Sequence, residues 1–238
     1  MRKAITILAA GGLLLLNAAA AAGEAQDVPA WPGRLGAYVF EVTRDGKPIG
    51  TQTVTLKQDG EVLTVTTESA IAVKMLGIVV YRMHQVLTDT YRGNRLVALA
   101  TETKDPDGLR VGKIAREDNR WTGKNGKQSR DFECDCDVST TMFHRDVLKG
   151  STVIEITKGL ARTVTIEDKG IETLDLPEGQ VQTRHFAVKG EIARDVWYDL
   201  AGNLVAAQQE GSDGSDIRQY LLSDPQAARP ISPEASEP

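Results

Sequence analysis

The stretch that decides the fold runs from residue 38 to residue 73 and reads YVFEVTRDGKPIGTQTVTLKQDGEVLTVTTESAIAV. Apolar side chains recur at every second position of its extended runs: Tyr38, Phe40 and Val42 in the first, and Leu63, Val65, Ile71 and Val73 in a later one, with Thr67 and Ser69 between them. The dipeptides Asp45-Gly46 and Asp59-Gly60 separate these runs, and such pairs favour tight hairpin turns. The stretch therefore predicts antiparallel hairpins with one buried face.

The same pattern continues along the chain. Further turn signals occur at 92–94, 105–108, 125–126, 169–170 and 202–203. Their short spacing leaves no room for crossover helices, so we predict one mainly β domain, a meander of about eleven antiparallel strands.

One segment departs from strand periodicity. Ser139 can cap a helix that places Met142, Arg145 and Val147 or Leu148 at helical spacing before Gly150. We therefore predict one short helix over residues 139–149.

The first 22 residues have the pattern of a cleaved signal peptide. Arg2 and Lys3 precede an apolar run from Ala4 to Leu16, and an alanine tract ends near Ala22. The run is 13 residues long, shorter than the roughly 17 to 25 residues that span a bilayer. We predict a periplasmic or secreted protein that does not span the membrane after cleavage.

Composition bounds the mature chain. Residues 23–224 are expected to form a single domain, and the proline-rich segment 225–238 a disordered tail. Losing Arg2 and Lys3 moves the formal net charge from −5 to −7. An acidic chain without a basic block argues against nucleic acid as a partner.

Cys134 and Cys136 lie in the stretch DFECDCDV, in which carboxylates alternate with other residues from Asp131 to Asp137. An oxidising compartment favours a Cys134–Cys136 disulfide. An extended strand would instead hold the two residues about 6.6 Å apart and leave two buried thiols. Both alternatives stay open. A metal site that adds His144 matches no familiar zinc spacing, and the acids lack an EF-hand pattern, so we expect no metal and a solvated acidic face.

No catalytic constellation is visible. The chain has no HExxH, Gly-x-Ser-x-Gly or Walker-type motif, and His84, His144 and His185 are scattered. We therefore expect no enzyme activity and no cofactor.

An apolar hairpin tip is the most informative local feature. The stretch AIAVKMLGIVV, residues 70–80, places Met75 and Leu76 at a turn, where polar residues are usual. Each such side chain left in water forgoes about 1.5 to 3 kcal/mol. The tip is expected to be covered by the chain's own helix, or to form a ligand mouth or a partner patch.

Several motifs together resemble a family of exported bacterial proteins that is itself a domain of unknown function. They are YVFEV at 38–42 with DGKPIG at 45–50, VYRMH at 80–84 with RGNRL at 92–96, the stretch 101–108, the Ser139 region, WYD at 197–199 and QYL at 219–221. The resemblance implies a strongly curved sheet or half-barrel partly closed around a helix, similar to periplasmic lipoprotein carriers that hold acyl chains.

The leading hypothesis is a non-catalytic periplasmic binding module whose concave sheet accepts a lipid or another apolar or amphipathic molecule. Met75, Leu76, Tyr81, Met83 and Phe143 are the expected ligand-lining residues. The alternative is an envelope interaction or structural module, in which strand edges and the apolar tip contact another envelope protein.

Overall fold

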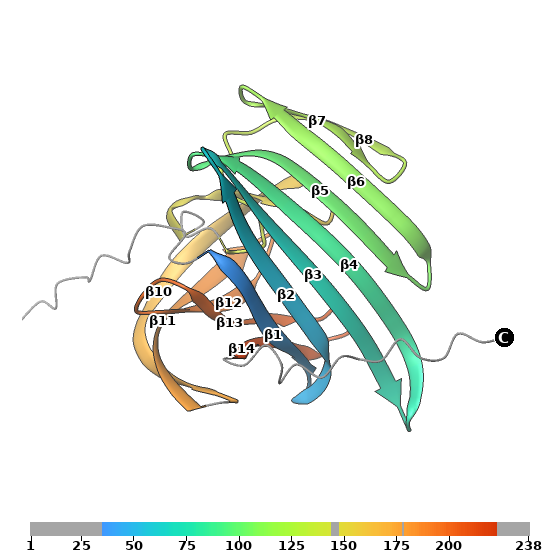
Figure 1. Cartoon of the computed structure of the whole chain (residues 1–238), viewed down its shortest axis with the longest axis vertical. Helices are drawn as coiled ribbons and strands as arrows, with labels where there is room; N and C mark the ends of the chain where they lie inside the picture. Colours follow the sequence, from blue (N-terminus) through green and yellow to red (C-terminus); the bar gives the residue numbers. More distant parts are fainter. Residues whose placement is uncertain (1–34, 144–147, 178, 223–238) are drawn as a thin grey trace, which may run out of the picture.

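The computed structural model describes residues 35–143, 148–177 and 179–222. Fourteen β-strands make up the regular structure of these residues (Figure 1). They are β1 (Gly36–Arg44), β2 (Lys47–Asp59), β3 (Val62–Met75), β4 (Ile78–Arg92), β5 (Arg95–Asp105), β6 (Gly108–Glu117), β7 (Arg120–Asn125), β8 (Gln128–Glu133), β9 (Thr152–Glu155), β10 (Leu160–Leu176), β11 (Gly179–Gly190), β12 (Arg194–Asp199), β13 (Leu204–Glu210) and β14 (Asp216–Leu222).

All fourteen strands belong to one antiparallel sheet, in the order β8-β7-β6-β5-β4-β3-β2-β1-β14-β13-β12-β11-β10-β9. The sheet is therefore two meanders joined at its centre, where the first and last strands pair from Val39↔Leu222 to Arg44↔Ile217. It is open, with β8 and β9 as its two edges.

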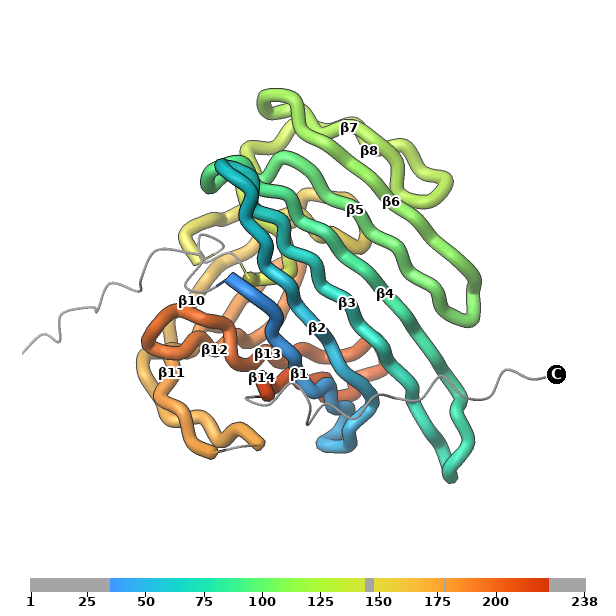
Figure 2. The backbone as a smooth tube through the Cα atoms, viewed as in Figure 1, coloured from blue at the N-terminus to red at the C-terminus, as the bar shows by residue number. Residues whose placement is uncertain are grey.

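The sheet is strongly curved, so that β10–β14 turn back toward β1–β5 (Figure 2). Its concave face carries the alternating apolar positions, and side chains from both meanders form one core there. The largest buried members are Phe40, Tyr91, Leu96, Trp121, Ile154 and Tyr198. Period-two alternation has thus produced one buried face in most strands, while Trp197, Val205 and Ala206 form a second, smaller cluster on the other face of β12 and β13.

The link between β8 and β9 fills one end of this concavity. We call residues 134–143 the plug. Cys136, Val138, Met142 and Phe143 are buried in it. Phe143 packs edge-on against Phe40 with ring centroids 5.7 Å apart. The plug thus joins the core of the two meanders.

The β3–β4 hairpin projects beyond the rest of the sheet. Pairing of β2 with β3 ends at Gly50↔Ile71, and pairing of β4 with β5 begins at His84↔Lys104. Residues 72–83 therefore continue as a two-stranded ribbon, seen at the lower right of Figure 1. Its outer edges have no strand partner among the described residues.

Three sequence expectations need correction. The strands number fourteen rather than eleven, partly because the turn after Asp118, a non-glycine residue with φ of 53°, carries no Gly or Pro signal. Lys169-Gly170 is not a turn but a bulge inside β10, since a glycine with positive φ serves either purpose.

The third correction concerns the predicted helix over 139–149. Ser139 instead forms a bridge with Ile154, and the described residues contain no α-helix. The backbone hydrogen bonds of this segment are made to β9 (Thr140 N to Ile154 O, 2.9 Å), which overrides its helical spacing. Residues 144–147 lie outside the described residues, as do the expected signal peptide and tail.

No helix in the described part of the chain is long and apolar enough to cross a membrane.

Candidate functional site

A groove of about 560 Å³ opens on the concave face. β1–β4 form one side of it, and β13, β14 and the turn between them form the other. Its lining residues are Val42, Arg44, Ile49, Gln52, Ser69, Ile71, Val73, Val80, Tyr81, Met83, Gln85, Gln209, Gly211, Ser212, Asp213, Ser215, Ile217 and Gln219. The strand alternation that builds the core thus continues into the groove.

The groove walls near the hairpin are apolar. Ile71 and Met83 face each other as register partners on β3 and β4, and Val73 faces Tyr81 one step further out. Burial, followed by the negative charge of Asp105, raises the pKa of the Tyr81 phenol. Its hydroxyl is therefore neutral and able to donate a hydrogen bond at physiological pH.

The floor of the groove is polar but uncharged. Gln52 Nε2 donates to Ser69 Oγ over 3.1 Å, and Gln85 Nε2 donates to Thr103 Oγ1 over 2.9 Å. Gln52 is only 9% exposed, and its Oε1 accepts no hydrogen bond from the described residues. Such buried amide oxygens are rare in folded proteins, because leaving one unpaired costs about 1 to 3 kcal/mol.

The opposite wall holds a third fixed amide. Arg194 donates to Gln209 Oε1 over 2.5 Å and to the carbonyl oxygen of Thr140 over 2.8 Å. Burial lowers the pKa of the Arg194 guanidinium. Because Arg194 binds the carbonyl oxygen of Gln209, the amide nitrogen of Gln209 remains available to the groove.

Among the described residues, the formal charges that line the groove are confined to its rim. Arg44 on β1 and Asp213 in the β13–β14 turn form an ion pair there. This pair connects the two sides of the rim and neutralises itself, so the interior lining carries no net charge.

A second hollow of about 410 Å³ lies at the base of the projecting hairpin. Ala70, Ala72, Arg82, His84, Lys104, Asp105 and Pro106 line it, together with Ile71 and Met83 of the main groove. His84 Nε2 lies 2.7 Å from Glu68 Oε1 at its exposed side. Because Ala70, Ala72 and His84 alternate with the side chains that line the groove, this hollow opens on the opposite face of the hairpin.

The tip of the hairpin carries large apolar side chains in solvent. Met75 is 65% exposed, Ile78 is 69% exposed, and Leu76 is fully exposed. Leu76 and Gly77 have φ of 51° and 83°, the values of a tight turn that favours Asn or Gly at both positions. Neither core packing nor turn chemistry accounts for Leu76.

A buried carboxyl group, that of Asp89, accepts hydrogen bonds from two hydroxyl groups of the plug. Asp89 Oδ2 accepts hydrogen bonds from Ser139 Oγ at 2.6 Å and Thr141 Oγ1 at 2.7 Å. Burial raises the pKa of Asp89 to about 6, and the hydroxyl hydrogen bonds limit the rise. Tyr198 adds a bond from its hydroxyl to the carbonyl oxygen of Met142, at 2.6 Å.

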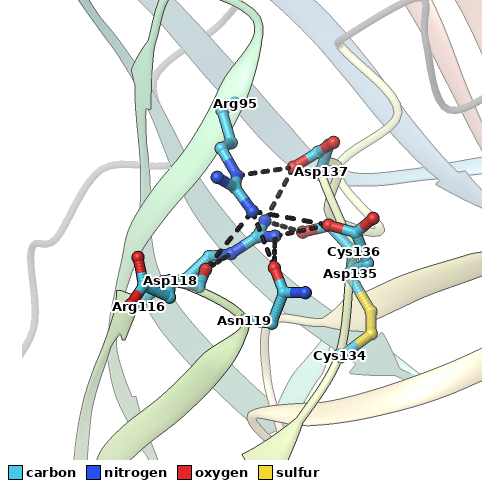
Figure 3. Close-up of polar contacts among 8 residues, drawn as sticks. All are labelled: Arg95, Arg116, Asp118, Asn119, Cys134, Asp135, Cys136 and Asp137. Atoms are coloured by element: carbon cyan, nitrogen blue, oxygen red, sulfur yellow. Dashed lines mark hydrogen bonds and ion pairs between the residues drawn. A yellow bond between two sulfur atoms is a disulfide. The ribbon is translucent and has the colours of Figure 1, made fainter.

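An arginine clamp fixes the start of the plug (Figure 3). Arg116 Nη1 lies 2.6 Å from Asp137 Oδ1 and donates to the Cys136 carbonyl oxygen at 3.0 Å, while Arg116 Nη2 lies 2.7 Å from Asp135 Oδ1. Arg95 approaches the same two carboxylates at 3.4 and 3.6 Å. Asp135 and Asp137 are thus ion-paired, and their side chains are still 73% and 48% exposed, so the acidic face is both solvated and paired.

The cysteines sit beside this clamp. Strand β8 ends at Glu133, so the stretch bends instead of continuing as a strand. Cys134 and Cys136 are joined by a disulfide with their Cα atoms 5.2 Å apart. No group of three or more His, Cys, Asp or Glu in the described residues could hold a metal ion, and His144 lies outside those residues.

The expected ligand-lining residues divide into three places. Tyr81 and Met83 line the groove. Met75 and Leu76 do not, because the ribbon carries them past its mouth. Phe143 is buried with the plug against Phe40, so it belongs to the core.

Sequence reasoning missed the glutamines of the groove. Gln52 shares the inward phase of Val54 and Leu56, and Gln85 shares that of Leu87. The available signal was a polar residue at a position where alternation expects an apolar one. Thr67 and Ser69 on β3 are residues of the same kind.

Comparison with known proteins supports the fold and the family. One solved structure, described as a β-barrel-like protein of domain of unknown function DUF1849 from Brucella abortus, is similar with a TM-score of 0.58 and 11% identity, over 79% of this chain and 98% of that chain. At that identity the likeness shows the fold alone. A comparison with curated proteins finds no match. Residues 40–221 match the family described as Domain of unknown function (DUF6134), and the chain belongs to that family.

Proposed function

We propose that the protein is a non-catalytic binding module that holds an amphipathic small molecule in the concave groove. The observation that carries this proposal is an open groove with apolar walls next to a buried amide oxygen that has no partner among the described residues. Its volume of about 560 Å³ falls in the range of about 300 to 1,000 Å³ that is usual for ligand sites.

The walls supply the apolar contribution to binding. Ile71, Val73, Met83 and Ile217 each present a side chain to the groove. Covering one such side chain contributes about 1.5 to 3 kcal/mol in the limit of full burial. A ligand with an alkyl or ring portion gains this free energy, and its polar portion can face the glutamines.

Native mass spectrometry of the mature protein from its own cells, followed by denaturing extraction, tests the proposal. We expect one apolar or amphipathic molecule per chain. Met83→Trp should reduce its occupancy by filling the groove, whereas Leu109→Trp on exposed β6 should not. A ligand-free wild-type protein, or equal occupancy in the two variants, would contradict the proposal.

A second function, recognition of an envelope protein, is favoured by the projecting ribbon. It combines an exposed apolar tip with the unpaired edges of residues 72–75 and 78–83, to which a strand of another chain can add. A photo-crosslinker at Leu76 should then capture one defined partner, while the same group at exposed Leu109 should not. Equal labelling from both positions would count against a specific partner.

Export is part of the same proposal. N-terminal sequencing of the protein from the periplasmic fraction should read from Gly23, directly after the expected cleavage site. Retention of Met1 in the cytoplasmic fraction would refute it.

A further inference from the structure

Hydrogen bonds to neighbouring side chains fix the orientation of three glutamine amides that line the groove. The nitrogens of Gln52 and Gln85 are engaged with Ser69 and Thr103; the carbonyl oxygen of Gln85 remains accessible to a ligand, whereas that of Gln52 is buried. The carbonyl oxygen of Gln209 is engaged with Arg194, so its amide nitrogen remains. Of these fixed amides, Gln85 therefore offers the groove an accessible acceptor and Gln209 a donor, each held by a neighbouring side chain.

The lining disfavours charged groups. Of the described residues that line it, Arg44 and Asp213 alone are charged, and they pair with each other at the rim. A ligand carboxylate or ammonium placed on the floor would lose hydration without finding an opposite charge. A hydroxyl or amide, by contrast, can replace its water hydrogen bonds with those of the glutamines.

We infer that the groove selects an uncharged amphipathic molecule whose polar head carries hydroxyl or amide groups. The head donates to Gln85 Oε1 and accepts from Gln209 Nε2, while its apolar part lies against Ile71 and Met83. This inference rests on the proposed function and names the ligand class of the same groove.

Three amphiphiles with the same decyl chain isolate the effect of the head: decyl β-glucoside, decanoate and decyltrimethylammonium. Each is titrated calorimetrically into the ligand-free mature protein at pH 7.5, below its critical micelle concentration. We expect decyl glucoside to bind at least tenfold more tightly than either charged compound, a difference of about 1.4 kcal/mol or more.

Variants at the floor then test the residues. Gln85→Leu should weaken decyl glucoside binding at least fivefold and change decanoate binding less than twofold. Gln58→Leu, on the exposed end of β2, is the matched control and should change neither. Thermal melts of both variants verify folding.

The outcomes separate the two proposals. Equal affinity for the three heads, or selectivity that survives Gln85→Leu, overturns the inference but leaves a groove that binds amphiphiles. Failure of all three compounds to bind overturns the proposed function and the inference together.

Discussion

Replacing Asp89 by Asn should abolish one component of the pH dependence of stability. The pKa of Asp89 is raised from 3.8 to about 6 in the folded protein, chiefly by burial. Between these values the folded state binds more protons than the unfolded state, so the free energy of unfolding falls as the pH rises. The Asp89 contribution is fully present below pH 3.8 and is lost as the pH passes through about 6.

The magnitude follows from the shift. Roughly two pKa units at 1.36 kcal/mol each give about 3 kcal/mol. Asn keeps an oxygen that can accept from Ser139 and Thr141 but carries no titratable charge. Relative to wild type, Asp89→Asn should therefore gain about 3 kcal/mol in stability between pH 4 and pH 7.

Urea unfolding at half-unit steps from pH 4 to pH 8 measures this difference. Other carboxyls titrate in both proteins, so the difference between them isolates Asp89. Asp59→Asn, at an exposed strand end, is the control for removing a carboxyl. A wild-type-to-variant difference that stays constant over this pH range would refute the reasoning.

Three further predictions concern the tip, the clamp and the disulfide. Leu76→Asn should stabilise the fold by about 1 kcal/mol, because Asn tolerates positive φ, and raise Tm by about 2 to 4 °C in a thermal melt; an unchanged or lower Tm would contradict this. Arg116→Ala should lower the free energy of unfolding in urea by about 2 to 4 kcal/mol, because the Arg116 side chain is only 2% exposed. Arg95→Ala should lower it by under about 1 kcal/mol, because the Arg95 side chain is 48% exposed. Equal losses in the two variants would argue against the clamp. Reducing Cys134–Cys136 should cost only about 1.5 kcal/mol, because the closed loop is three residues; a loss above about 4 kcal/mol in dithiothreitol would show a larger role.

The antiparallel meander was predictable because its signals are local. Alternation in residues 38–42 and 63–73 and the Asp-Gly turns depend only on neighbouring residues, and the structure has hairpins at both. The apolar tip at Met75 and Leu76 was visible for the same reason.

The plug was not predictable, because its conformation depends on distant contacts. Ser139 bonds to Asp89, fifty positions earlier in the chain, and Arg116 reaches Asp137 from another strand. Helical spacing in residues 139–149 carried no information about either contact. The groove shares this difficulty, since β2 and β13 meet across it only after the sheet has curved.

The order of the strands has a consequence for how the chain is made. β1 emerges first from the ribosome, yet its β14 neighbour, through Leu222, emerges last. Until β14 has been synthesised, the backbone N–H and C=O groups along one edge of β1 have no strand partner. Each meander can form by successive hairpins, but the two meanders can pair with each other only once β14 is present. A chain that ends just before β14 would therefore form two half-sheets with unpaired edge strands. Such edges promote aggregation and are recognised by chaperones and quality-control proteases.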